Sequence, residues 1–400
     1  MAHGGDAVAR HDGKVVFVPY AIPGEEILVE LVEEKGAYSR AWPIEVIKPS
    51  PDRIEPLCPH FGTCGGCQWQ HISYERQLTL REEILASQLA RIGHLPNVVT
   101  RSTLATEEPW YYRNNAQLHL DEEGRLGFIS ATDRQVLPIG ECHIMHPLVW
   151  DMWSALEVDF PGLETVTLRA STASEEQLVI LETARDELPE VDVDLPVSCV
   201  LLLGDGTPVT YVGSPHITEV VGGTSLRVSA TSFFQFNTAQ TERLLSTVIE
   251  YADPQGDQLL LDLYCGVGTL GLNLADRVDK VVGIDSSGAA IGDAVFNSQG
   301  MPKVRFLQGN VEELVATVEE EVDLVLLDPP RSGVSKEALA AVIDKAPARV
   351  IYVSSDPATL ARDVGRMVQA GYELAEVQPV DMSPQTYHVE AVALLRLQQP

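Results

Sequence analysis

The chain has 400 residues, 45% of them hydrophobic, and carries a formal net charge of −30. This length exceeds what one hydrophobic core fills, so we expect two or three folded domains. The first fourteen residues lack the apolar core of a signal peptide, and no apolar run approaches the roughly 18 residues that a membrane span requires. We therefore expect a cytoplasmic protein without a membrane partner.

The negative charge argues against a generic polyanion-binding protein, because phosphate contacts normally come from Lys and Arg. The charge is unevenly spread, at −7 over residues 1–150 and −23 over residues 151–400. If nucleic acid binds, we expect the N-terminal part and a local basic groove to bind it. The alternative is that the acidic surface only keeps the chain in solution.

The first 50 residues have the pattern of a small β-barrel. In "GKVVFVPYAIPGEEILVELVEEKGAYSRAWPIEVIKPS", apolar and polar residues alternate in short bursts that are broken by Pro-Gly and Gly-Ala. This pattern predicts an antiparallel, OB-like module that ends near Pro49.

Three cysteines come next, within ten residues. In "CPHFGTCGGCQWQ", Cys58, Cys64 and Cys67 have the spacing C-x5-C-x2-C, and the whole chain holds six cysteines. Six cysteines make a poor disulfide framework for 400 residues, whereas a cluster of three favours a metal or redox site in a reducing compartment.

A helix and a mostly β region follow the cysteines. The segment "SYERQLTLREEILASQLARIG" has Leu85, Leu89 and Ile92 at helical spacing and stops at Gly93, which predicts a helix. From about residue 112 to 224, runs such as "AQLHL", "RLGFIS", "SCVLLLG" and "PVTYVG" lie between Gly, Pro and Asp turns. They predict a second, mostly β domain.

From Thr231 onward, helical patterns alternate with buried strands, which predicts a doubly wound α/β domain with a mostly parallel sheet. Its segment "LLLDLYCGVGTLGLNLA" is a strand, a turn with Gly266, Gly268 and Gly271 in G-x-G-x-x-G register, and a helix. Such a turn lets the backbone approach a ligand. Asp285 ends the next strand, where it can accept hydrogen bonds from ribose hydroxyls. A nicotinamide oxidoreductase fits these features equally well.

The segment "VDLVLLDPPRSG" separates these possibilities. It ends a strand at Asp328 and continues with two prolines, so a carboxylate and rigid carbonyls lie where open α/β sheets bind ligands. Asp-Pro-Pro at a strand end resembles the substrate-base pocket of S-adenosylmethionine-dependent methyltransferases that act on nucleobases or amides. The alternative is a proline-rich strand end without a binding role.

Six segments in order resemble the RNA 5-methyluridine methyltransferase family, the bacterial 23S rRNA and tRNA uracil-C5 methyltransferases. They are "CPHFGTCGGCQWQ", "SFFQFNTAQTERLL", "LLDLYCGVGTLGLNLA", "VDLVLLDPPRSGV", "RVIYVSSDPATLARDVG" and "YHVEAVALLRL". The resemblance covers nearly all of the chain and implies that the N-terminal module is a TRAM domain. It also implies a 4Fe-4S cluster held by the clustered cysteines and a fourth, Cys142, although four thiolates alone would suit zinc equally well. The two remaining cysteines, Cys199 and Cys265, are expected to be buried as small hydrophobic residues.

The resemblance also implies which residues contact S-adenosylmethionine. These are Gln235, Tyr264, Gly266, Gly268, Thr269, Asp285, Asn310 and Asp328. Asn310 stands where the family often has an acidic residue at the adenine, and Thr269 stands where Asn is common.

The chain departs from the family at the nucleophile. The family adds a cysteine thiolate to C6 of uracil, in a "SCNP" tetrad, before the methyl group reaches C5. Here the tetrad reads Ser354-Ser355-Asp356-Pro357, so Ser355 takes the place of the cysteine. A serine hydroxyl is hardly ionised near neutral pH and is a much weaker nucleophile. Glu390, the expected acceptor of the C5 proton, is retained.

We therefore expect three domains: a TRAM-like OB barrel (1–50), a central iron–sulfur and RNA-binding domain (51–230), and a Rossmann-like class I methyltransferase domain (231–400). The expected protein is a monomer that methylates uracil C5 of rRNA or tRNA. The alternative is a family member that binds cofactor and RNA without this reaction, or that methylates another target.

Overall fold

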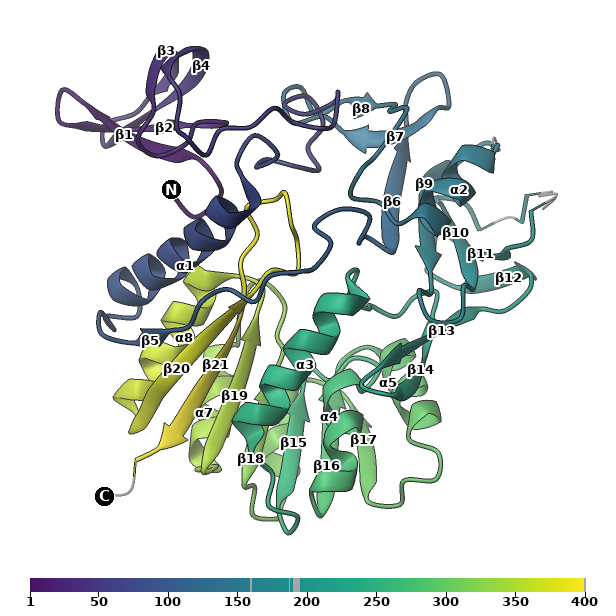
Figure 1. The fold of residues 1–400 in the computed structure, drawn as a ribbon. Helices are drawn as coiled ribbons and strands as arrows, with labels where there is room; N and C mark the ends of the chain where they lie inside the picture. Colours follow the sequence, from purple (N-terminus) through teal and green to yellow (C-terminus); the bar gives the residue numbers. More distant parts are fainter. Residues whose placement is uncertain (159, 187, 190–194, 399–400) are drawn as a thin grey trace.

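The computed structural model describes residues 1–158, 160–186, 188–189 and 195–398. Over these residues the chain forms sheets of four, seven and eight strands and a separate two-stranded hairpin. The four-stranded sheet and the central sheet lie above the large C-terminal sheet in Figure 1. In that view the C-terminal sheet extends to both sides of α3, from β17 at the right to β20 and β5 at the left.

The N-terminal sheet has the strand order β1-β2-β4-β3. Its strands are β1 (Ala7–His11), β2 (Lys14–Val18), β3 (Glu26–Glu34) and β4 (Tyr38–Lys48). The expectation of a wholly antiparallel module is wrong, because β2 and β4 pair in parallel while the other two pairs are antiparallel. Small residues such as Ala41 form its core, so the sheet is thin.

Helix α1 (Tyr74–Arg91) joins this region to the C-terminal domain. It packs on α8 (Pro357–Gln369), and a Cβ placed on Gly93 would lie 2.9 Å from the carbonyl oxygen of Ala361, so the close approach requires glycine. Ile92 continues the helical spacing in the sequence, but it is the C-cap residue of the helix and remains 41% exposed.

The central region is mostly β, as expected. Its sheet has the order β12-β11-β10-β9-β6-β7-β8, and only the β10–β11 pair is parallel. The elements are β6 (Asn115–Leu120), β7 (Leu126–Ile129), β8 (Val136–Leu137), α2 (Pro147–Ala155), β9 (Leu163–Ala170), β10 (Gln177–Thr183), β11 (Ser198–Leu202) and β12 (Pro208–Val212). A separate hairpin, β13 (His216–Val221) and β14 (Thr224–Ser229), leads to the C-terminal domain.

The C-terminal sheet has the order β17-β16-β15-β18-β19-β21-β20-β5, with its first five strands parallel. Its strands are β5 (Val99–Thr100), β15 (Leu259–Leu263), β16 (Lys280–Asp285), β17 (Val304–Gln308), β18 (Leu324–Leu327), β19 (Arg349–Ser354), β20 (Tyr372–Val380) and β21 (Glu390–Leu397). Its helices are α3 (Thr238–Ala252), α4 (Thr269–Leu274), α5 (Gly288–Asn297), α6 (Val311–Leu314), α7 (Lys336–Asp344) and α8. Strand β5 comes from the N-terminal half of the chain and extends the sheet beside β20. No helix of the described residues has the length and apolarity to cross a membrane.

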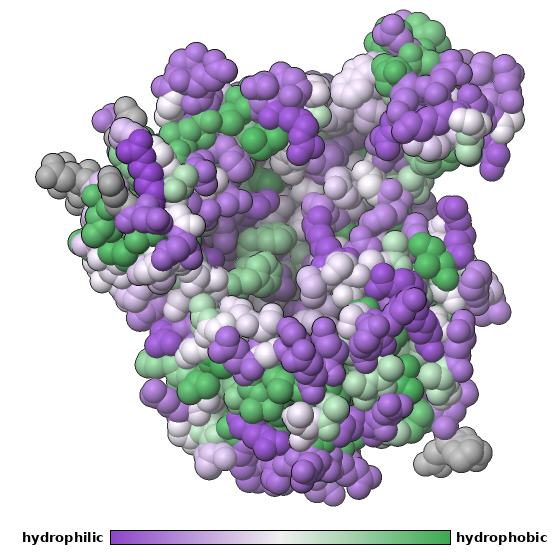
Figure 2. All heavy atoms as spheres, turned by 180° about the vertical axis from the view of Figure 1, so that it is seen from behind, coloured by the Kyte–Doolittle hydropathy of each residue, from purple (hydrophilic) through white to green (hydrophobic). Residues whose placement is uncertain are grey.

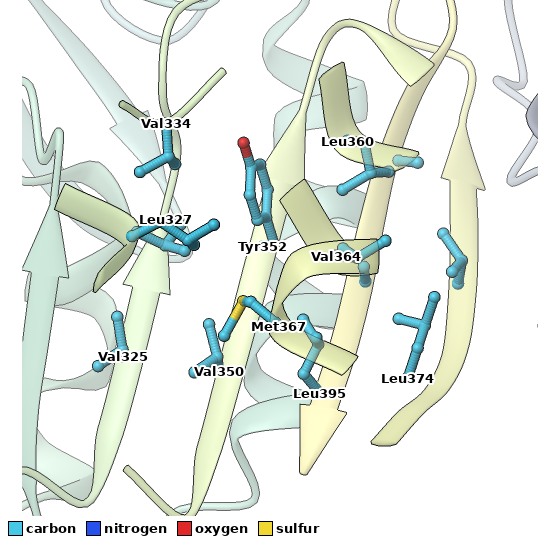
Figure 3. Packing of buried hydrophobic residues seen from close by; sticks show 14 of the residues in the cluster. Val325, Leu327, Val334, Val350, Tyr352, Leu360, Val364, Met367, Leu374 and Leu395 are labelled. Carbon is cyan, nitrogen blue, oxygen red and sulfur yellow. The ribbon is translucent and has the colours of Figure 1, made fainter. Parts of the chain in front are cut away.

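Helices cover both faces of this sheet, so its parallel strands are buried on both sides and read as continuous apolar runs. Figure 3 shows one face, where Val325 of β18 and Val350 of β19 lie beside Val364 and Met367 of α8. Tyr352 belongs to the same cluster, and its hydroxyl group donates to Asp363 Oδ2 at 2.9 Å. This rigid core fixes the carboxyl ends of the strands, where the candidate site lies.

Candidate active site

A pocket of about 710 Å³ lies at the carboxyl edge of the large sheet. Residues from the ends of β15, β16, β18 and β19, and from the start of β21, line one side of it. Segments that precede β6 and α3 line the other. The surface in Figure 2 is hollowed between the N-terminal sheet, the central sheet and the C-terminal domain. The pocket therefore lies where an open α/β sheet binds ligands.

The glycine turn forms one wall of the pocket. Gly266 has a φ of 55°, and a Cβ placed on it would meet no atom within 4 Å, so its backbone faces open space. Asp285, at the end of β16, accepts from the Gly266 amide at 3.0 Å through Oδ2 and from the Ser287 amide at 2.8 Å through Oδ1. These bonds fix the carboxylate beside the turn, with lone pairs left for a ligand.

Asp262 is a site residue that the sequence analysis missed. It is 1% exposed, and its Oδ2 accepts from the Gly271 amide at 3.0 Å. In the described part of the chain its Oδ1 has no hydrogen-bond partner, although this atom is buried. Burial, reinforced by Asp328 and Asp285, raises the pKa of Asp262 to about 7. A lone acid within the apolar strand "LLLDLY" is the signal that could have found it.

Two further carboxyl groups line the pocket, one after the end of β18 and one at the start of β21. Burial, followed by the charge of Asp285, raises the pKa of Asp328 to about 7. Burial, followed by the charge of Asp328, raises the pKa of Glu390 to about 8. The pocket thus holds several carboxyl groups that repel one another, and a cationic ligand would relieve this repulsion.

The structure brings nearly all the expected contact residues to this one pocket. Those that line it are Gln235, Tyr264, Gly266, Thr269, Asp285, Asp328, Ser355 and Glu390. The two others do not line it. Gly268 caps α4, and Asn310 is exposed at the start of α6, where its Nδ2 lies 3.4 Å from Glu313 Oε1.

Aromatic and basic side chains that the sequence analysis left unassigned line the rest of the pocket. Phe233 lines it and is 71% exposed, an unusual position for a large apolar ring. Arg113, Arg331 and His388 also line it. Arg331 belongs to the segment "DPPRSG" and His388 to "YHVEAV". Each segment therefore contributes a further pocket residue beside the expected Asp328 and Glu390.

The chain is similar in sequence and in fold to known proteins. A family model described as tRNA (uracil-5-)-methyltransferase matches residues 221–398. An uncharacterized RNA methyltransferase of Thermosynechococcus vestitus is 34% identical, over 99% of this chain and 96% of that protein. Another, from Streptomyces avermitilis, is 36% identical, also over 99% and 96%.

A solved structure agrees with these matches. The crystal structure of Pyrococcus abyssi tRNA (uracil-54, C5)-methyltransferase in complex with S-adenosyl-L-homocysteine is 28% identical to the chain. It superposes with a TM-score of 0.76 over 98% of this chain and 99% of that one. The chain belongs to the RNA uracil-C5 methyltransferase family. It is thus an RNA methyltransferase of the class I fold, as the resemblance implied.

The Ser355-Asp356 pair departs from the tetrad that the resemblance led us to expect. Ser355 lines the pocket and is half-buried. Asp356 caps α8, because its Oδ1 accepts from the amides of Ala358 and Thr359 at 2.9 Å each. Its Oδ2 lies 3.1 Å from Nε2 of His3. Both oxygens are engaged away from the pocket, so Asp356 is not placed as a base for Ser355.

The environment of Asp356 favours its ionised form. Burial alone would raise the pKa of this carboxyl group, but the contact with His3 and the helix amides outweigh burial and lower it to about 2. A family member with Asn at this position would have a neutral cap. The N-terminal segment therefore contacts the loop that holds Ser355 through His3 and the carboxylate of Asp356.

The four cysteines expected to bind a metal line a second cavity, of about 400 Å³. Burial raises the pKa of each thiol, to about 12 at Cys67 and about 11 at Cys142. Neighbouring cysteines add to this rise at Cys64, Cys67 and Cys142. Over the residues that the structure describes, no three His, Cys, Asp or Glu side chains are grouped closely enough to hold a metal ion. Cys199 and Cys265 are 2% and 7% exposed, which confirms that they are buried.

Proposed function

We propose that the pocket binds S-adenosylmethionine over the glycine turn and an RNA uridine between Ser355 and Glu390, so that the chain methylates uracil C5 of an rRNA or tRNA. The observation that carries this proposal is that the cofactor-side residues and the base-side residues line one pocket of about 710 Å³. A single pocket of this size accommodates two ligands in contact.

The cofactor side fits S-adenosylmethionine. The open space at Gly266 allows backbone contact, and Asp285 supports recognition of ribose hydroxyls. The unpartnered Oδ1 of Asp262 supports a ligand that brings a hydrogen-bond donor or a positive charge. When bound, S-adenosylmethionine supplies an electrophilic methyl group. We assign Gln235, Tyr264 and Thr269 as further contacts, and Gly268 and Asn310 as residues that act only through the shape of their turns.

The base side supports uracil chemistry in part. Phe233 offers an exposed ring on which an unstacked base can stack. Glu390 is the base for the C5 proton, because a carboxylate with a raised pKa holds a proton more strongly than an ordinary one. Ser355 is in position to add to C6, but its hydroxyl group is a weak nucleophile. We therefore expect uracil methylation by the protein as it stands to be too slow to leave a detectable covalent adduct.

The replacement of cysteine by Ser355 favours a second candidate function, methylation of another RNA atom or binding without methylation. Mass spectrometry of RNA nucleosides, after incubation with the protein and labelled S-adenosylmethionine, separates the candidates. Labelled 5-methyluridine would support the first proposal. Label in any other nucleoside, or cofactor and RNA binding without label, would support the second.

We also propose that Cys58, Cys64, Cys67 and Cys142 hold a 4Fe-4S cluster. Their side chains line one cavity without being tightly grouped. Four thiolates suit either a 4Fe-4S cluster or a zinc ion, and we choose the cluster because the cysteine spacing resembles that of the family's cluster-binding members. The cluster would hold the loops around Cys64 and Cys142 in one shape.

The same proposal covers the organisation of the chain. Residues 1–50, with the four-stranded sheet, form a TRAM-like OB module, and residues 51–230 form the iron–sulfur and RNA-binding region. Residues 231–400 form the methyltransferase domain. We further propose that the protein acts as a monomer in the cytoplasm. Size-exclusion chromatography with light scattering tests the monomer.

A further inference from the structure

We propose that Arg331 and Arg113 form an anion subsite on the nucleotide side of the pocket, and that it binds the backbone phosphate of the target nucleotide. This inference rests on the proposed function and names the charge that recognises its RNA substrate. Neither arginine was assigned a role by the sequence analysis.

The first argument is charge balance. The chain has 28 Lys and Arg residues against 58 Asp and Glu residues, so carboxylates outnumber the cationic side chains that could pair with them. Arg53, Arg227 and Arg349, for example, lie 2.5, 2.6 and 2.9 Å from carboxylate oxygens. Over the described residues, Arg331 and Arg113 have no carboxylate oxygen within 4.0 Å. Because both guanidinium groups line the pocket without such a partner, they are able to bind an incoming anion there.

The second argument is that each guanidinium group is fixed by a hydrogen bond but keeps other N–H donors without a partner. Arg331 Nη2 lies 3.0 Å from Nδ1 of His388, and Arg113 Nε donates to the carbonyl oxygen of Asn115 at 2.8 Å. The Arg113 guanidinium group also lies 5.2 Å from the centre of the Phe236 ring. These contacts fix the two side chains and leave other N–H groups free for a phosphate, which accepts bidentate bonds from arginine.

The third argument is that both arginines line the same pocket, although they are far apart in the sequence. Arg331 Nη2 contacts the ring of His388 there, at 3.0 Å from Nδ1. Burial, followed by the charges of Arg331 and Arg113, lowers the pKa of His388 to about 4. His388 is neutral near pH 7 and adds a ring nitrogen rather than a charge to this side of the pocket.

Sheet topology indicates which ligand the subsite faces. The glycine turn and Asp285 lie at the ends of β15 and β16, whereas Arg331 follows β18 and Ser355 follows β19. The Arg331 carbonyl oxygen accepts from Oγ1 of Thr359, in the first turn of the helix after Ser355. Arg331 is thus on the side of the target base, away from the turn that holds the cofactor. A phosphate of the target nucleotide fits this position.

Two other anions could occupy these arginines, and the test must separate them. The carboxylate of the cofactor is one. The cysteine thiolates are the other for Arg113, because Arg113 also lines the cysteine cavity and its charge acts on Cys64. Arg331 does not line the cysteine cavity, so a change in RNA binding on its substitution cannot arise from the thiolates.

The experiment measures binding of a fluorescent, uridine-containing single-stranded RNA to full-length protein in the presence of S-adenosylhomocysteine, across a range of salt concentrations. The variants are Arg331→Gln and Arg113→Gln. The matched control is Arg305→Gln, which removes an exposed arginine paired with Glu320 outside the pocket. We expect each pocket variant to bind RNA about tenfold more weakly, on the scale of a charge-assisted hydrogen bond. The slope of log K against log salt should fall by about 0.7 for each lost phosphate contact.

Two further measurements decide the outcome. Uridine 5′-monophosphate should compete with the RNA more strongly than uridine, and Arg331→Gln should abolish this difference. S-adenosylhomocysteine affinity and the midpoint of thermal unfolding should stay at the wild-type values. Loss of S-adenosylhomocysteine affinity with unchanged RNA affinity would overturn the inference in favour of the cofactor carboxylate. RNA binding equal to wild type in both variants would overturn it outright. Failure of the wild type to bind any RNA would instead contradict the proposed function.

Discussion

The guanidinium group of Arg81 lies 2.9 Å from the carboxylate of Asp381, and both side chains are fully buried. Arg81 also donates to the carbonyl oxygens of Ser383, Thr386 and His388 at 3.0, 3.0 and 3.2 Å. Helix α1, close to the cysteine segment, thereby holds the loop that leads into β21 and its Glu390. The position of α1 therefore influences the position of Glu390 in the pocket.

Substitution of Arg81 by methionine should lower the free energy of unfolding by about 3–5 kcal/mol, because it leaves the buried Asp381 without its partner. Urea denaturation measures this. The double variant Arg81→Met/Asp381→Leu should recover part of the loss, since neither charge then remains buried. The control Arg91→Met changes an exposed arginine of the same helix and should shift stability by less than about 0.5 kcal/mol. Equal losses for Arg81→Met and Arg91→Met would contradict the proposed coupling.

The raised pKa of Glu390 predicts a pH dependence of stability. In the folded chain this carboxyl group holds its proton up to about pH 8, whereas its ordinary value is 4.5. Between these values the folded state binds more protons than the unfolded state, so stability falls as pH rises, by up to about 1.4 kcal/mol per pH unit for one group. Glu390→Gln should remove this contribution. The variant should match wild type near pH 4 and exceed it in stability near pH 8.5, as measured by urea denaturation at each pH. A constant difference at both pH values would show that Glu390 titrates normally.

Cofactor binding should also depend on pH. Asp262 and Asp328 have pKa values raised to about 7 in the ligand-free pocket, so both ionise between pH 6 and pH 8. S-adenosylmethionine carries a sulfonium charge that S-adenosylhomocysteine lacks. Its affinity should therefore rise more steeply over this range than that of S-adenosylhomocysteine, in calorimetric titrations of both ligands.

The variant Asp262→Asn should flatten the pH profile for S-adenosylmethionine and leave the S-adenosylhomocysteine profile nearly unchanged. Asp279→Asn, which changes a partly exposed aspartate paired with Lys303, serves as the control. Identical pH profiles for the two ligands on the wild type would exclude an electrostatic role of these carboxyl groups.

The chain as it stands should form no covalent adduct with 5-fluorouridine RNA, because Ser355 scarcely ionises. Ser355→Cys should form one, seen as a slow band in denaturing gels, since cysteine is nearly isosteric and Asp356 keeps the loop in place by capping α8. Combined with Glu390→Gln, Ser355→Cys should accumulate an adduct with ordinary uridine RNA, because no base removes the C5 proton. Ser355→Cys protein that binds cofactor and RNA without forming an adduct would favour the second candidate function.

The proposed cluster makes a separate prediction. Protein purified without oxygen should be brown and contain about four irons per chain. Cys142→Ala should lose the colour and the iron. Cys199→Ala, in a buried strand away from the cavity, should keep both. One zinc per chain with no iron would rule the cluster out.

Local patterns in the sequence were sufficient for most of the fold. Helical spacing before Gly93, alternation in the central strands and apolar runs after Thr231 each correspond to an element of the structure. These signals depend on residues a few positions apart, which touch within one element. The same holds for the glycine turn and for Asp328 at a strand end, because a strand end determines where its next side chain lies.

Other features depended on residues that are distant in the sequence. The parallel pairing of β2 with β4 and the addition of β5 to the large sheet follow from chain crossings that no local pattern encodes.

What only the tertiary structure decided is the electrostatic state of the site. The sequence by itself determined that Asp262, Glu390, Arg331 and Ser355 are present and which elements carry them. It could not determine that Asp262 and Glu390 have raised pKa values, or that over the described residues no carboxylate oxygen lies within 4.0 Å of the Arg331 guanidinium group. A pKa and an ion pair depend on burial and on distances of a few ångströms between groups far apart in the chain, and only the packed fold sets those distances.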